Sequence, residues 1–247
     1  IGLHRARHAK LYLYAHLSRA GIDRARWRPD FRRRPFGLKT DHDDAAVRAH
    51  LAESDPVLAE LMERYDVLLV EENDREREHY AALVRTIVGQ QLSNHVVAIL
   101  WGRLLERFGG HPPTPAEILA DDPEELRAAV GLSNAKVSYL RSLAEQVESG
   151  ALDLDHISEL PDEEVVAELT TVRGIGVWSA HMFLMFQLGR PDVLPWGDLA
   201  ICKGVEQAYG LDQTPKRAAL EELAERWRPH RSAACRVIWW TIDRADD

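Results

Sequence analysis

The chain has 247 residues, of which 45% are hydrophobic and 29% charged, and its formal net charge at pH 7 is −9. This composition is typical of a soluble globular protein and excludes a disordered chain. No stretch approaches the ~20 apolar residues of a membrane helix, and no apolar core near the N-terminus indicates a secretion signal. The two cysteines, Cys202 and Cys235, lack metal-type spacing and are too few for a four-cysteine iron–sulfur cluster. We therefore expect reduced thiols in a cytoplasmic protein.

The charges are distributed unevenly along the chain. Residues 1–40 hold eleven Lys/Arg and two Asp, whereas the remainder holds 20 Lys/Arg and 38 Asp/Glu. Residues 1–42 therefore form a basic N-terminal extension, which is either an arm that lies along nucleic acid or a poorly ordered extension. The acidic remainder does not exclude a nucleic-acid ligand, because backbone amides and a few arginines can bind phosphates locally.

From about residue 43 the sequence predicts helices almost throughout, because Ala, Leu, Glu and Arg dominate and β-branched alternation is absent. Ser93 and Ser133 are expected to cap helices, as are Thr114 and Asp122, each of which precedes a proline. After Ser93, one apolar stripe is expected to comprise Val96, Val97, Leu100 and Leu104. The other expected helices span 76–91, 162–169, 177–188, 198–209, 214–227 and 232–244. Short connections between these helices indicate an all-α fold.

Two glycines in the segment 169–182 mark a hairpin between two helices. Gly174 and Gly176 permit positive φ and close backbone approach, and they flank Ile175, which we expect to anchor the hairpin in the core. Free N–H groups at the start of the second helix then form an anion site for one or two phosphates, bound without reading sequence. The alternative is an ordinary helix–helix turn. The candidate DNA-binding residues of the hairpin are Val172, Arg173, Gly174, Ile175, Gly176 and Ser179.

Asp198 opens a predicted helix within the segment 193–201, after a turn shaped by Pro195 and Gly197. One interpretation is an N-cap that contributes ~1 kcal/mol of stability. The helix dipole and backbone donors also favour the charged form of a carboxylate at this place. Such a carboxylate can stabilise an oxocarbenium ion and orient water during cleavage of an N-glycosidic bond. Asp198 is therefore the candidate catalytic residue.

The hairpin followed by Asp-Leu-Ala-Ile at 198–201 resembles the HhH-GPD superfamily of DNA glycosylases, named for a helix-hairpin-helix, a Gly/Pro-rich loop and a catalytic aspartate. Three more segments are similar to its DNA-3-methyladenine glycosylase II branch. They are Ile-Val-Gly-Gln-Gln-Leu-Ser at 87–93, Gly-Leu-Ser-Asn-Ala-Lys at 131–136, and Trp-Arg-Pro-His-Arg-Ser at 227–232 with Trp239 and Trp240. The resemblance implies one domain over 43–247, a two-lobed helical fold with the active-site cleft between the lobes, and no N-terminal β-domain.

The resemblance further implies a monofunctional glycosylase that hydrolyses the N-glycosidic bond of 3-methyladenine and 7-methylguanine in double-stranded DNA. Relatives with lyase activity carry a lysine where this chain has Trp178, which cannot form a Schiff base. The alternatives are a non-catalytic DNA-binding module and a glycosylase for other lesions, such as ethenoadenine or hypoxanthine. We expect a nucleoid-associated bacterial monomer with no membrane partner and no catalytic cofactor. In relatives, the hairpin carbonyls often hold a structural monovalent cation.

The resemblance places a wedge, which fills the gap left by an extruded nucleotide, in the turn that ends at Ser93. Gln91 is the first choice for insertion, with Gln90 and Leu92 behind it, and Gln90, Gln91 and Ser93 are the DNA-binding candidates here. The alternative is that both glutamines cap the helix junction or bond the backbone. Lys136 is interpreted either as a phosphate contact or as a solvated lysine.

An indole face attracts a cationic base, so tryptophans are the candidates for the base pocket. Trp239 and Trp240 are candidates, and resemblance favours Trp239 for stacking. The other pocket candidates are Trp178, Met182 and Trp196. Some relatives have tyrosine at the position of Met182, which indicates a shallower pocket here. The alternative is core packing, favoured for Trp101, Trp178 and Trp227. Arg231 and Ser232 either contact phosphate and brace the site or form caps and salt bridges.

Overall fold

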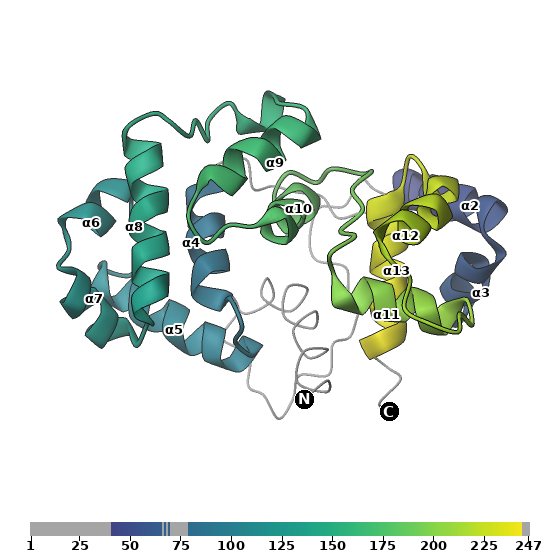
Figure 1. The fold of residues 1–247 in the computed structure, drawn as a ribbon, viewed down its shortest axis with the longest axis horizontal. Helices are drawn as coiled ribbons and strands as arrows, with labels where there is room; N and C mark the ends of the chain where they lie inside the picture. Colours follow the sequence, from purple (N-terminus) through teal and green to yellow (C-terminus); the bar gives the residue numbers. More distant parts are fainter. Residues whose placement is uncertain (1–40, 66, 68, 70–78, 244–247) are drawn as a thin grey trace. The chain divides into compact units, whose positions relative to one another are not determined.

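The computed structural model of the chain describes residues 41–65, 67, 69 and 79–243, so the basic segment 1–40 lies outside the described residues. The described residues form helices and contain no β-strand, which confirms the all-α prediction (Figure 1). They divide into two compact units, in agreement with a two-lobed helical fold. The terminal unit comprises the described residues of 41–69 together with 189–243. The central unit comprises 79–188. None of the described helices combines the length and the apolar character that crossing a bilayer requires.

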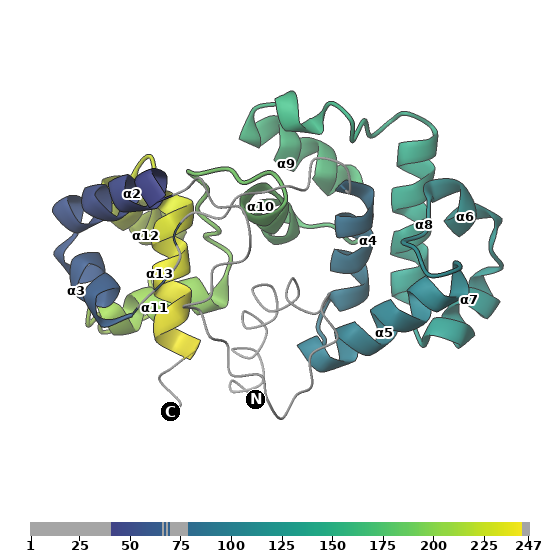
Figure 2. The same cartoon turned by 180° about the vertical axis from the view of Figure 1, so that it is seen from behind.

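The terminal unit brings together helices from both ends of the described chain (Figure 2). Its elements are α2 (Asp41–Ser54), α3 (Pro56–Arg64), α11 (Leu199–Ala208), α12 (Arg217–Ala224), the 3₁₀ turn η4 (Glu225–Trp227) and α13 (Arg231–Asp243). α13 packs against α11 and α3, and α2 packs against α3. Gly204 allows the close approach of α11 to α13, because a Cβ at that position would lie 2.4 Å from Ile238 Cγ2.

Asp55 joins three elements of the terminal unit through a fully buried carboxylate. It caps α3 by accepting hydrogen bonds from the backbone N–H groups of Val57 and Leu58. Its Oδ2 accepts from Tyr209 Oη at 2.6 Å and from Trp227 Nε1 at 2.9 Å. Burial of Trp227 confirms the core role expected for that residue.

The central unit is built around α8. Its elements are α4 (His79–Gly89), α5 (Asn94–Arg107), α6 (Pro115–Ala120), α7 (Pro123–Val130), α8 (Asn134–Glu148), the 3₁₀ turn η3 (Ile157–Glu159), α9 (Asp162–Thr171) and α10 (Val177–Phe186). α8 packs against α4, α6 and α7, and α10 packs against α4 and α9. Thr114, Asp122 and Ser133 cap their helices as predicted, and Thr114 forms a capping box with Glu117.

Two details of the predicted helices are wrong. Val96 is 36% exposed and lies off the buried stripe of α5, to which Val97, Leu100 and Leu104 belong. The helix expected from residue 214 begins at Arg217, with Lys216 as an N-cap in the extended conformation. Thr214 lies outside the helix, and its hydroxyl donates to the carboxylate of Glu206.

Candidate functional site

The hairpin joins α9 to α10 in the central unit. Ile175 is 4% exposed, so the predicted anchoring role is confirmed. Gly174 has a φ of +89°, and a Cβ there would lie 2.3 Å from the Tyr139 ring, so both backbone conformation and space favour glycine. Gly176 differs, because its φ is −101° and its surroundings leave room for a Cβ. The expected need for glycine therefore holds at Gly174 alone.

The first turn of α10 presents backbone N–H groups without a side-chain cap, because Gly176 occupies the N-cap position. Gly176 and Val177 are exposed, so an anion can approach this end of the helix. Among the candidate side chains of the hairpin, Val172 and Ser179 are buried and Arg173 is exposed. Contacts of Val172 and Ser179 with DNA would therefore use the backbone, and these assignments stay predictions.

The predicted wedge turn, residues 90–93, connects α4 to α5 in the central unit. Gln90 Nε2 donates to the carbonyl oxygen of Gly174 at 2.7 Å, which is the backbone-bonding alternative for this glutamine. Gln91 is exposed, and it is the only non-glycine residue in the described part of the chain with positive φ, at 59°. Leu92 is half-buried behind it, and Ser93 caps α5 through Val96 N at 3.5 Å. The two glutamines thus have different surroundings.

Lys136 bonds the last turn of α4, just before the wedge turn, which neither sequence interpretation anticipated. Its Nζ donates to the carbonyl of Val88 at 2.7 Å, near the C-terminus of α4, where the helix dipole favours a cation. Burial lowers the pKa of Lys136 to about 8.

Asp198 lies in the terminal unit as the N-cap of α11, as predicted, and is 5% exposed. Its Oδ1 accepts from Ile201 N at 2.9 Å and from Trp239 Nε1 at 3.3 Å. Burial raises the pKa of Cys202 and of Cys235, and the charge of Asp198 raises both pKa values further. Both thiols therefore stay neutral beside the carboxylate.

The tryptophan candidates differ in their surroundings. Trp239 is 9% exposed, and its indole N–H contacts Asp198, a role for which the sequence offers no local signal. Trp196 is half-buried, and the Arg217 guanidinium lies 4.2 Å from the centroid of its ring. In the central unit, Met182 is buried within α10 and Trp178 is half-buried. Their assignment to a base pocket stays a prediction.

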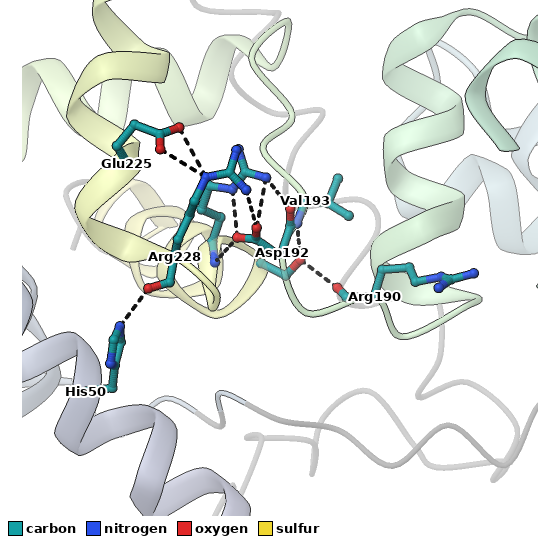
Figure 3. Close-up of polar contacts among 8 residues, drawn as sticks. His50, Arg190, Asp192, Val193, Glu225 and Arg228 are labelled. Carbon is teal, nitrogen blue, oxygen red and sulfur yellow. Dashed lines mark hydrogen bonds and ion pairs between the residues drawn. The ribbon is translucent and has the colours of Figure 1, made fainter. Parts of the chain in front are cut away.

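Side chains of α13, together with Arg228 directly after η4, hold the segment that leads to Asp198 (Figure 3). The Asp192 carboxylate accepts from Arg231 Nε at 2.7 Å and from Arg228 Nη1 at 2.5 Å. Ser232 Oγ donates to the Arg190 carbonyl at 2.7 Å and accepts from Val193 N at 3.0 Å. Arg231 and Ser232 thus brace this segment through a salt bridge and hydrogen bonds.

Metal coordination by side chains finds no support in the described residues, which contain no group of three or more His, Cys, Asp or Glu suited to an ion. The cation expected at the hairpin would use backbone carbonyls instead and stays a prediction.

The chain is similar in sequence and in structure to proteins of known family. The family described as "HhH-GPD superfamily base excision DNA repair protein" matches residues 84–229. DNA-3-methyladenine glycosylase 1 of Schizosaccharomyces pombe is 35% identical over 69% of this chain and 75% of the yeast protein. The structure of the S. pombe 3-methyladenine DNA glycosylase in complex with abasic DNA matches 82% of this chain and 98% of its own, at 31% identity and a TM-score of 0.70. A DNA-3-methyladenine glycosidase from Bacillus halodurans matches 85% of this chain and 93% of its own, at 30% identity and a TM-score of 0.70.

Proposed function

Because the chain belongs to the HhH-GPD superfamily of base excision DNA repair proteins, we propose that it is a DNA glycosylase for alkylated purines. The observation that carries the proposal is the buried carboxylate of Asp198 at the N-terminus of α11. In the reaction, the bond between the deoxyribose C1′ and the purine nitrogen breaks, and its electron pair leaves with the base. Asp198 stabilises the resulting oxocarbenium ion, orients the water that adds to C1′ and accepts the proton that this water loses.

The proposed substrates are 3-methyladenine and 7-methylguanine in double-stranded DNA, bound by a monomer. Alkylation gives these purines a positive charge, so they leave as neutral molecules without a strong general acid. An electron-rich indole attracts such a cation, and Trp239 lies beside Asp198. Alkylated purines therefore suit a site whose chemistry depends on one carboxylate.

The central unit supplies the proposed DNA contacts. The N–H groups at the start of α10 bind phosphate, and the exposed Gln91 fills the gap that the extruded nucleotide leaves. Trp178 occupies the position of the lysine in relatives with lyase activity, so water is the proposed nucleophile and no Schiff base forms. These assignments make the proposed enzyme a monofunctional glycosylase of the II type.

The decisive experiment compares the wild-type protein with Asp198→Asn on methylated duplex DNA and measures released 3-methyladenine and 7-methylguanine by chromatography. Asparagine caps helices about as well as aspartate, so the substitution keeps the cap and removes the charge. We expect the wild type to release both bases and Asp198→Asn to lose at least about 100-fold in rate. Asp122→Asn is the matched control, since Asp122 caps α7 in the other unit.

Equal release by the wild type and Asp198→Asn would contradict the role of Asp198. Binding of DNA without release of any base would favour a non-catalytic module. The same assay on ethenoadenine and hypoxanthine tests the lesion range. Borohydride treatment during the reaction tests for a Schiff base, and a trapped protein–DNA adduct would contradict hydrolysis by water alone.

A further inference from the structure

Resting on the proposed function, we infer that Gln90 is a positioning residue that holds the wedge turn in register with the phosphate-binding hairpin. Its side-chain amide donates to the carbonyl of Gly174, a residue 84 positions away in the sequence. The bond joins the end of α4 directly to the hairpin between α9 and α10. The role differs from direct DNA contact, because the side chain of Gln90 is engaged within the protein.

The acceptor of this bond is firmly placed. Gly174 lies against the Tyr139 ring so closely that even one added carbon would overlap it. Ile175, the next residue, is anchored in the core, and Ile175 N donates to the Val172 carbonyl at 3.0 Å. A group that bonds the Gly174 carbonyl is therefore fixed relative to the exposed N–H groups at the start of α10.

The conformation of the wedge turn gives independent support. Gln91 has a φ of +59°, a left-handed conformation that is costly for a residue with a Cβ and persists where its surroundings impose it. Two hydrogen bonds restrain the backbone just before Gln91: Lys136 Nζ donates to the Val88 carbonyl, and Gln90 Nε2 donates to the Gly174 carbonyl. The first bond connects the end of α4 to α8, and the second connects the wedge turn to the hairpin. The side chain of Gln91 stays exposed.

A fixed register has a consequence for base extrusion. Extruding a paired nucleotide costs stacking and pairing energy, and a wedge offsets that cost only if it meets the gap while the hairpin holds the backbone. Loss of the Gln90 bond lets the turn shift relative to the bound phosphate. The extrusion step is then impaired, whereas binding of undamaged DNA depends mainly on the hairpin and changes little.

The test uses Gln90→Met, which keeps the length of the side chain and removes the donor. Gln146→Met is the matched control, because Gln146 of α8 bonds Thr171 at the end of α9 and does not bond the wedge turn. Its Nε2 donates to the Thr171 carbonyl at 3.1 Å, and its Oε1 accepts from Thr171 Oγ1 at 2.8 Å. Single-turnover excision is measured on duplexes in which the alkylated purine lies opposite its normal partner or opposite an abasic analogue. The second duplex needs less work for extrusion.

We expect Gln90→Met to slow excision about tenfold on the paired duplex and less than about threefold opposite the abasic analogue. Gln146→Met is expected to match the wild type on both duplexes. Gln90→Lys restores a donor for the Gly174 carbonyl. For this variant, the ratio of the excision rate on the paired duplex to the rate opposite the abasic analogue should return toward the wild-type ratio. Equal slowing on both duplexes, or no rescue by lysine while both variants melt at the wild-type temperature, would overturn the proposal.

A second readout does not require catalysis. In the Asp198→Asn background, the fluorescence of a 2-aminopurine next to the target base increases when saturating protein unstacks it. We expect Gln90→Met to make this fluorescence increase smaller. The Kd of the variant for undamaged duplex should change less than about threefold. If Gln90→Met leaves the fluorescence increase unchanged, the role of Gln90 is refuted. This result does not depend on catalysis, because failure of the wild type to release a base would refute the proposed function separately.

Discussion

The carboxylate of Asp198 receives one hydrogen bond from its own helix and one from a distant tryptophan. Ile201 N belongs to the first turn of α11, whereas Trp239 Nε1 comes from α13. The helix bond is available to any N-cap aspartate, but the indole bond fixes the carboxylate relative to a second element. At the residue scale, Trp239 therefore contributes more than an aromatic face.

Trp239→Phe tests this contribution, because phenylalanine keeps a ring and removes the N–H donor. A hydrogen bond to a charged group contributes about 1.5–3 kcal/mol, so we expect the single-turnover excision rate to fall about 10- to 100-fold. The affinity for DNA should change little. Trp101→Phe is the control, because Trp101 lies on α5 in the central unit and is assigned to core packing. A rate unchanged by Trp239→Phe would mean that the ring alone accounts for the role of Trp239.

The buried carboxylate of Asp55 makes a separate prediction about stability. Asp55→Ala removes the acceptor of two backbone N–H groups, Tyr209 Oη and Trp227 Nε1, so buried donors lose their partner. We expect the free energy of unfolding to fall by about 3–5 kcal/mol, measured by urea denaturation. Asp122→Ala removes a helix cap of ordinary exposure and should cost only about 1 kcal/mol. Similar losses in the two variants would contradict a special role for the Asp55 network.

The range of an interaction along the sequence decides whether it could be predicted. Thr114, Asp122 and Asp198 were predictable as caps, because each bonds backbone groups within three residues. The bond from Gln90 to Gly174 and the bond from Trp227 to Asp55 were not predictable, because the partners lie 84 and 172 residues apart in the sequence. Such contacts depend on how helices pack, and neither composition nor periodicity specifies that packing.

At the scale of elements, the segment between α10 and α11 has little regular structure but is held at its start by α13. Asp192 bonds Arg231, and Ser232 bonds the backbone on both sides of Asp192 (Figure 3). The same helix carries Trp239, which bonds Asp198 at the end of the segment. One helix thus restrains both ends of the stretch that positions the candidate catalytic group.

Asp192→Asn weakens the first of these restraints by removing the charge that faces Arg228 and Arg231. We expect faster amide hydrogen exchange over 190–197 and a single-turnover excision rate about 3- to 10-fold lower, with DNA binding unchanged. Glu225→Gln is the matched control, because the Glu225–Arg228 pair is more exposed and such pairs contribute little. Exchange that stays at the wild-type rate would show that α13 does not restrain this segment.

Helix boundaries show the same division between local and distant causes. Of the predicted apolar stripe of α5, only Val96 is exposed. Helical spacing defines which face of a helix is apolar, but neighbouring elements decide how much of that face is buried. α12 begins later than expected, and Thr214, where its start was expected, instead bonds Glu206 of α11, a partner on another helix. The existence and type of the helices after residue 76 were therefore predictable, whereas the bounds of α2 and α3 and the edges set by tertiary contacts were not.

At the scale of the whole molecule, the charge distribution limits how the protein can hold DNA. Residues 79–188, which contain the hairpin, include seven Lys/Arg and fifteen Asp/Glu. Long-range attraction by this unit is therefore weak, and the proposed phosphate contacts depend on backbone N–H groups and on the exposed Arg173. Backbone N–H groups carry no net charge, so such contacts place few cationic side chains on the phosphates. Binding therefore releases few of the counterions condensed on DNA.

The dependence of affinity on salt tests this limit. Each phosphate neutralised by a cationic side chain contributes about −0.9 to the slope of log K against log salt, so one to three such contacts predict a slope no steeper than about −3. Affinity for undamaged duplex, measured by fluorescence anisotropy, should then fall less than about 60-fold between about 50 and 200 mM salt. Arg173→Gln should make the slope shallower by about 1, and Arg103→Gln should not. A slope steeper than about −6 would require more cationic contacts than the hairpin supplies, and the eleven Lys/Arg of residues 1–40 would then be the source to test.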